Sequence, residues 1–153
     1  MDLKELLKNI KKYEGKKITL EGWVRNHRKQ KEFGFIDFSD GTCFQHIQIV
    51  YDNKLKDFEE IKKIHIGSAI KLIGIVTPSS GKEQAYEIKT EEIILLGKCP
   101  EDYPIQAKRH SREFLREQAY LRPRTNLFQA VFRIRSLAAL AIHTYFGKQG
   151  YIY

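Results

Sequence analysis

The residues with the clearest capacity for chemistry lie around Phe35. We expect a strand from Phe33 to Phe38, in which successive side chains alternate between the two faces. Ile36 and Phe38 then share one face. Phe33, Phe35 and Asp37 share the other face, where a strand would ordinarily show polar residues. This pattern places an aromatic ring beside a carboxylate on one accessible surface.

The segment before this strand carries no acidic residue until Glu32. Its basic residues are Arg25, Arg28, Lys29 and Lys31. An exposed ring next to several cations is typical of a surface that stacks unpaired nucleic-acid bases. The alternative is that Phe35 covers the core beneath a loop, since most aromatic side chains serve packing. Both interpretations stay open on this segment alone.

Composition restricts the class of protein. A chain of 153 residues suits one ordinary domain, or one small domain and part of another. No apolar run approaches the ~20 residues of a membrane span, and the amino-terminal residues lack the layout of a secretory signal. Cys43 and Cys99 lack the spacing of a metal site and imply no disulfide, so we expect a cytoplasmic protein without bound metal.

The net charge of +8 is unevenly distributed. Seven of the nine arginines fall between Arg109 and Arg135. A planar guanidinium pairs well with phosphate, so this cluster is compatible with a nucleic-acid partner. It is equally compatible with a surface that pairs with acidic residues of another domain or subunit.

The hydrophobic periodicity predicts a small β-barrel. An amphipathic helix over residues 2–13 precedes the strands, and a helix over residues 55–65 separates the third from the fourth. The five expected strands cover residues 17–27, 33–38, 44–51, 68–77 and 85–96. Three strands, a helix and two strands is the chain order of an OB-fold, a five-stranded Greek-key barrel, whose closure removes the exposed edges.

In an OB-fold, the face of strands two and three and the loops between strands 1–2 and 4–5 bind oligonucleotides. Here that face would carry Phe35, Asp37 and Gln48. The loop between strands one and two would add basic side chains. The loop between strands four and five spans residues 78–83. Since separate segments converge on one patch, the stacking interpretation of Phe35 becomes the favoured one.

The remainder of the chain reads as a hinge and one long helix. Glycine, prolines and acidic residues predict a linker over residues 97–106. Ser111 can cap a short helix, and Asn126 can cap a longer one that ends near Phe146. The long helix has a broad apolar side, which a missing domain or another subunit must cover.

Several segments resemble the anticodon-binding domain of class IIb aminoacyl-tRNA synthetases. Two of these segments are residues 22–25 and 33–37, whose pattern the aspartyl and lysyl branches of the class share. Residues 84–88 and above all 121–126, Leu-Arg-Pro-Arg-Thr-Asn, are similar to the asparaginyl branch in particular. The resemblance covers nearly the whole chain.

The resemblance implies that the barrel holds the splayed anticodon bases of a tRNA, since unstacked bases offer both faces and edges. Phe35 would stack on the middle base, and Gln48 would hydrogen-bond an edge of that base. Arg28 would bind a base or a phosphate from the first loop. Gln48 as a merely solvated residue, and Arg28 as a generic phosphate contact, remain alternatives.

The other anticodon bases would face different residues. Glu87 would accept hydrogen bonds from the first base, taken to be guanine, whose N–H groups suit a carboxylate. Its alternative is an ion pair with Lys89 or another lysine. The third base would face His27 and the loop after Pro78, although His27 can equally be an ordinary loop residue.

The resemblance also implies a division into an OB-fold anticodon-binding domain (residues 1–98), a hinge (99–125) and the start of an α+β catalytic domain (126–153). The chain lacks the ATP-binding motifs, so we expect an amino-terminal part that holds no catalytic residue. ATP, Mg²⁺, asparagine and a homodimer formed through the catalytic domain belong to the full-length ligase. Alternatives are a general single-stranded nucleic-acid-binding module and an aspartyl-type synthetase of relaxed specificity.

Overall fold

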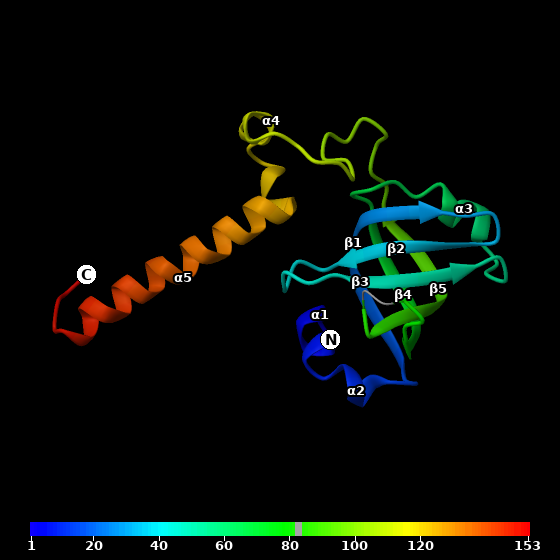
Figure 1. Ribbon diagram of the computed structural model, residues 1–153, viewed down its shortest axis with the longest axis horizontal. Helices are drawn as coiled ribbons and strands as arrows, with labels where there is room; N and C mark the ends of the chain where they lie inside the picture. Colours follow the sequence, from blue (N-terminus) through cyan, green and yellow to red (C-terminus); the bar gives the residue numbers. More distant parts are fainter. Residues whose placement is uncertain (82–83) are drawn as a thin grey trace. The chain divides into compact units, whose positions relative to one another are not determined.

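The computed structural model describes residues 1–81 and 84–153 (Figure 1). By their contacts these residues form two compact units, Met1–Ala107 and Lys108–Tyr153. The division falls inside the expected hinge of residues 99–125.

The first unit is a closed five-stranded barrel, which confirms the predicted OB-fold. Its strands are β1 (Lys17–Lys29), β2 (Phe33–Ser39), β3 (Ile47–Asp52), β4 (Ala69–Pro78) and β5 (Tyr86–Gly97). The order around the barrel is β1-β2-β3-β5-β4; β3 and β5 pair in parallel, and the other neighbouring strands pair antiparallel. Figure 1 shows β2 and β3 lying side by side across the barrel.

Alternate side chains of the strands point into the barrel and form its core, as the period-two pattern predicted, except where the pairing shifts in β1 and between β4 and β5. The largest fully buried core side chains on the strands are Leu20, Val24, Ile36, Phe38, Ile47, Ile49, Tyr51, Ile70, Leu72 and Ile88. Leu3 and Leu6 are also fully buried and belong to the same core. The outward side chains of the same strands form the outer face of the barrel, which is the candidate binding surface.

The helices of this unit are short. α1 (Leu3–Lys8) and α2 (Ile10–Tyr13) replace the single expected helix, because the backbone leaves helical geometry at Asn9. The Asp2 side chain caps α1 by accepting a hydrogen bond from the Glu5 N–H. α3 (Phe58–Lys62) lies between β3 and β4 in the chain and contributes buried apolar residues to the core.

The third strand starts later than the sequence pattern predicted, at Ile47 instead of Phe44. The preceding loop is organised by Asp40. Its Oδ1 accepts hydrogen bonds from the N–H (2.9 Å) and the hydroxyl (2.7 Å) of Thr42, and its Oδ2 accepts one from the Leu3 N–H (2.6 Å). These bonds tie the loop to the start of α1 and hold it out of the sheet.

A β-bulge in β1 decides which side chains reach the outer surface. The pairing with β2 shifts between Val24 and Asn26, so an extra residue is inserted there. Val24 points inward, and strict alternation would turn residue 28 inward as well. After the bulge, however, Arg28 is opposite the outward Phe35, while His27 is opposite the inward Ile36.

The second unit is helical. α4 (Arg112–Glu117) is capped by Ser111, as predicted, and η1 (Arg122–Arg124) follows it. In the long helix α5 (Asn126–Lys148), the cap is Thr125, one residue earlier than expected, because its hydroxyl accepts from the Phe128 N–H. No helix of the described residues is both long and apolar enough to span a membrane.

Much of the apolar surface of α5 is accessible in this chain. The large exposed apolar side chains of this helix are Leu127, Val131, Ile134, Leu137, Leu140, Ile142, Tyr145 and Phe146. Single exposed apolar residues are normal, but so many large ones on one helix are not.

Candidate nucleic-acid interface

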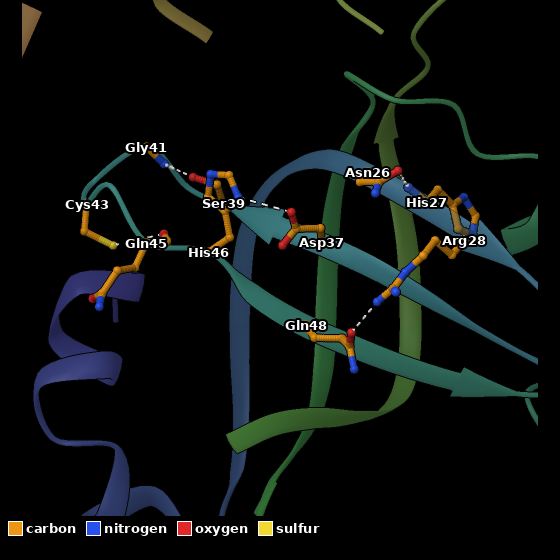
Figure 2. Close-up of polar contacts among 10 residues, drawn as sticks. All are labelled: Asn26, His27, Arg28, Asp37, Ser39, Gly41, Cys43, Gln45, His46 and Gln48. Carbon is orange, nitrogen blue, oxygen red and sulfur yellow. Dashed lines mark hydrogen bonds and ion pairs between the residues drawn. The ribbon is translucent and has the colours of Figure 1, made fainter. Parts of the chain in front are cut away.

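Arg28 and Gln48 meet above the ring of Phe35 on the outer face of the barrel. The Arg28 guanidinium carbon lies 5.2 Å from the centroid of the Phe35 ring, within cation–π range. The Arg28 Nη2 donates a hydrogen bond of 2.7 Å to the Gln48 Oε1, and Figure 2 shows this bond bridging two strands. Three predicted residues from three different strands therefore form one contiguous group.

Phe35 lies on the outer face and is only half-buried. Its ring meets the exposed ring of Phe33 edge to face, with centroids 5.4 Å apart and planes at 87°. Phe35 does not belong to the buried core cluster. The position of the ring therefore agrees with the predicted stacking surface, and packing beneath a loop does not describe it.

Gln48 connects this group to Glu87 on β5. Its Nε2 donates to the Glu87 Oε2 at 3.3 Å, and the Ser79 hydroxyl donates to the same oxygen at 2.9 Å. Among the described residues, no ion pair joins Glu87 to Lys89. A continuous polar chain thus runs from the guanidinium on β1 to the carboxylate on β5, over the surface that carries Phe35.

Asp37 extends the same face toward the loop before β3. It is paired across the strands with Asn26 on one side and Gln48 on the other. Its Oδ2 is 3.1 Å from the Nδ1 of His46, and Figure 2 shows the two side chains facing each other. The outer face therefore offers a neutral amide, a carboxylate and a histidine next to the aromatic ring.

The structure does not bring His27 into this group. Its ring points inward, where Nδ1 lies 3.0 Å from the Ile64 carbonyl oxygen and Nε2 lies 2.7 Å from the Tyr51 hydroxyl. Since a carbonyl only accepts, Nδ1 carries the proton and the Tyr51 hydroxyl donates to Nε2. The predicted role of His27 in reading the third base finds no support in this placement.

Burial lowers the pKa of His27 below 6.5, its ordinary value, and the nearby charges of Lys29 and His65 act in the same direction, against the hydrogen bond to Ile64. Burial also raises the pKa of Tyr51 to about 12, with a further contribution from Glu59. Both side chains are therefore neutral near pH 7, as their mutual hydrogen bond requires.

This shift predicts an acid-sensitive barrel. Below about pH 6.5 the unfolded chain takes up a proton at residue 27 before the folded chain does, so the free energy of unfolding falls as the pH is lowered. Thermal unfolding of the wild type and of His27→Gln between pH 5 and pH 8 measures this contribution. The variant should show a flatter dependence on pH, and identical slopes would contradict the assignment.

Pro78 ends β4 and lies exposed on the surface, opposite Tyr86 on β5. Ser79 follows it and begins the loop between β4 and β5. Of the loop residues predicted to face the third base, Lys82 and Glu83 lie outside the described residues. The polar chain of the outer face reaches the end of β4 through Ser79, the residue that follows Pro78.

Sequence reasoning did not single out Ser79, although it included this residue in the binding loop. The hairpin register supplies the signal: Glu87 pairs with Thr77, and Ser79, two residues after Thr77, has its side chain on the same side of the hairpin. No group of three or more potential metal ligands occurs among the residues that the structure describes. The ring of Phe35 and the polar side chains around it can bind a ligand by stacking and by hydrogen bonds.

Comparison with known proteins places this geometry in context. Residues 18–96 match the family of OB-fold nucleic acid binding domains known as tRNA_anti-codon. The chain is 49% identical to asparagine–tRNA ligase of Acholeplasma laidlawii and 46% identical to that of Bacillus cereus, over 100% and 99% of its own length. It spans about a third (33%) of the length of each of these relatives.

Solved structures show the same fold. Asparaginyl-tRNA synthetase from Pyrococcus horikoshii superimposes with a TM-score of 0.78 at 24% identity, over 92% of this chain and 34% of that one. Aspartyl-tRNA synthetase from Entamoeba histolytica gives a TM-score of 0.81 at 18% identity, over 99% of this chain and 38% of that one. At these identities the likeness concerns the architecture alone.

Proposed function

The chain belongs to the family of OB-fold nucleic acid binding domains, and from this premise we propose that it is the anticodon-recognition part of an asparagine–tRNA ligase. The observation that carries the proposal is the connected surface of Arg28, Phe35, Gln48 and Glu87. It combines an accessible ring with polar groups of defined orientation. An unpaired base needs both, a flat apolar partner and fixed hydrogen-bonding groups at its edge.

The geometry supports a specific mode of binding. In the unbound chain, the Arg28 guanidinium lies over the Phe35 ring. The middle anticodon base stacks on this ring in its place, and the released guanidinium reaches a phosphate or the base itself. Because Gln48 keeps its bond to Glu87, its amide remains oriented toward the edge of that base.

Glu87 accepts hydrogen bonds from the first anticodon base. Guanine offers two kinds of N–H donor on its pairing edge, and an ionised carboxylate is a pure acceptor. The third base faces the end of β4 and the loop after Pro78. Selection of the triplet thus depends on residues from β2, β3 and β5 and from the end of β4.

The whole protein would join asparagine to its tRNA with ATP and Mg²⁺. In this proposal those substrates bind to the part of the longer protein that lies outside this chain, which spans about a third (33%) of the length of its relatives. The exposed apolar side chains of α5 support a homodimer formed through the catalytic domain.

Binding of RNA hairpins to the chain tests the proposal. A hairpin carrying the asparagine anticodon, GUU, should bind several-fold more tightly than one with a changed middle base, and both affinities should fall as salt is raised. Equal affinity for both hairpins would indicate a general single-stranded nucleic-acid-binding module. Equal affinity for the asparagine and aspartate anticodons would instead favour a synthetase of relaxed specificity.

A further inference from the structure

We propose that Ser79 is a positioning residue for the first anticodon base, because it fixes the carboxylate of Glu87 so that one of its two oxygens is presented to guanine. This inference rests on the proposed function and extends it to a residue that touches no base. Its basis is the set of hydrogen bonds around one hydroxyl group at the end of β4.

The Ser79 hydroxyl uses both of its capacities within the protein. Its hydrogen is donated to the Glu87 Oε2 at 2.9 Å, and its oxygen accepts the Gly81 N–H at 3.1 Å. The Ser79 N–H donates to the Ala85 carbonyl oxygen at 2.9 Å, which closes the base of the loop. The loop therefore determines the orientation of the Ser79 hydroxyl, so that its hydrogen is directed at Glu87.

Glu87 is held from two sides at the same oxygen. Its Oε2 accepts one hydrogen bond from Ser79 and a second, of 3.3 Å, from the Nε2 of Gln48. A carboxylate oxygen has about two acceptor positions, so Oε2 is fully used and Oε1 remains for a ligand. The carboxylate plane is thereby fixed before any base arrives, which lowers the entropy cost of binding.

This arrangement favours guanine over adenine. Guanine points N–H donors at Oε1, whereas adenine presents the lone pair of N1 at the same place, where a fixed carboxylate repels it. Without the Ser79 hydroxyl, the glutamate side chain can turn away from adenine and loses its preset orientation toward guanine. Ser79 thus acts on the ratio of the two affinities, through Glu87.

The test compares two RNA hairpins that differ only in guanine or adenine at the first anticodon position. For the 153-residue chain, Ser79→Ala should reduce the guanine-over-adenine ratio of affinities by about tenfold, the value of one hydrogen bond to a charged group. Ser79→Thr should restore the ratio because it keeps the hydroxyl. Ser136→Ala, a change at an exposed serine of α5 outside the barrel, is the matched control and should leave the ratio unchanged.

The variants also separate positioning from loop structure. If Ser79→Ala weakens both hairpins equally, or weakens neither, Ser79 only shapes the loop and the inference is wrong. In a Glu87→Gln background, Ser79→Ala should cause no further loss of the ratio, because the two residues act as one unit. Ser79→Cys keeps the shape with a weaker donor and should resemble Ser79→Ala, which guards against a folding artefact.

The outcomes for the wild type distinguish this inference from the proposed function. A wild type without any preference for guanine would overturn the role of Glu87 and the inference with it. A wild type that prefers guanine, and loses this preference in Glu87→Gln but keeps it in Ser79→Ala, would contradict the role of Ser79 alone.

Discussion

Replacing Phe35 by alanine should weaken binding of the asparagine anticodon hairpin by ~1–3 kcal/mol, or about 5- to 150-fold, the cost of losing one base–aromatic stack. The ring lies on the outer face, half-buried, beneath a guanidinium that can move aside. Titration of the labelled hairpin by fluorescence anisotropy gives the affinity directly. Since the ring is not part of the buried core, the fold should survive the substitution.

The matched control for this variant is Phe44→Ala. Phe44 is also an accessible phenylalanine, in the loop before β3, and the ring contacts of the structure link it neither to Phe35 nor to Arg28. Its loss should change the affinity little. If both variants bind as the wild type does, the outer face of β2 is not where the base stacks.

The second large effect is expected in the free energy of unfolding of Gly34→Ala. Gly34 points inward between Phe33 and Phe35, and a Cβ atom there would lie 2.6 Å from the Cε1 of Tyr51 and closer still to its Cζ and hydroxyl. Tyr51 is fully buried, so it has no room to retreat. Such overpacking typically costs ~1–3 kcal/mol.

Chemical denaturation of the variant measures this loss. Gly97→Ala is the control in the same barrel, because a Cβ atom there meets only the Cβ of Ala69 at 3.6 Å, an ordinary contact. It should leave the stability nearly unchanged. A Gly34→Ala variant as stable as the wild type would mean that Tyr51 and its bond to His27 can rearrange freely.

The architecture could be predicted from the sequence because the alternation of side chains along the strands and the order of the elements along the chain define it. Alternation along β2 placed Ile36 and Phe38 in the core and Phe35 on the outside, as the structure confirms. Chain order then fixed which strands share the face, so Gln48 and Phe35 could be assigned to one surface in advance. The face that carries Phe35 and Gln48 could therefore be predicted from the sequence alone.

The sequence could not show what the bulge in β1 does. A single inserted residue reverses the alternation after Val24, which turns His27 inward and Arg28 outward. The hydrogen bond from Ser79 to Glu87 could not be predicted either, because it depends on the register of the hairpin that joins β4 and β5. Local hydrogen bonds at Asp40 and Thr125 likewise moved the start of β3 and the cap of α5.

Photocrosslinking shows whether an unpaired base lies flat on the ring of Phe35, on which the whole mode of binding depends. A hairpin with 5-iodouridine as the middle anticodon base is bound to the chain and irradiated, and mass spectrometry identifies the attached residue. The account predicts attachment at Phe35, and no comparable yield when the iodouridine is moved into the stem. Attachment instead at the exposed Trp23 or along α5, or equal yields from both hairpins, would contradict it.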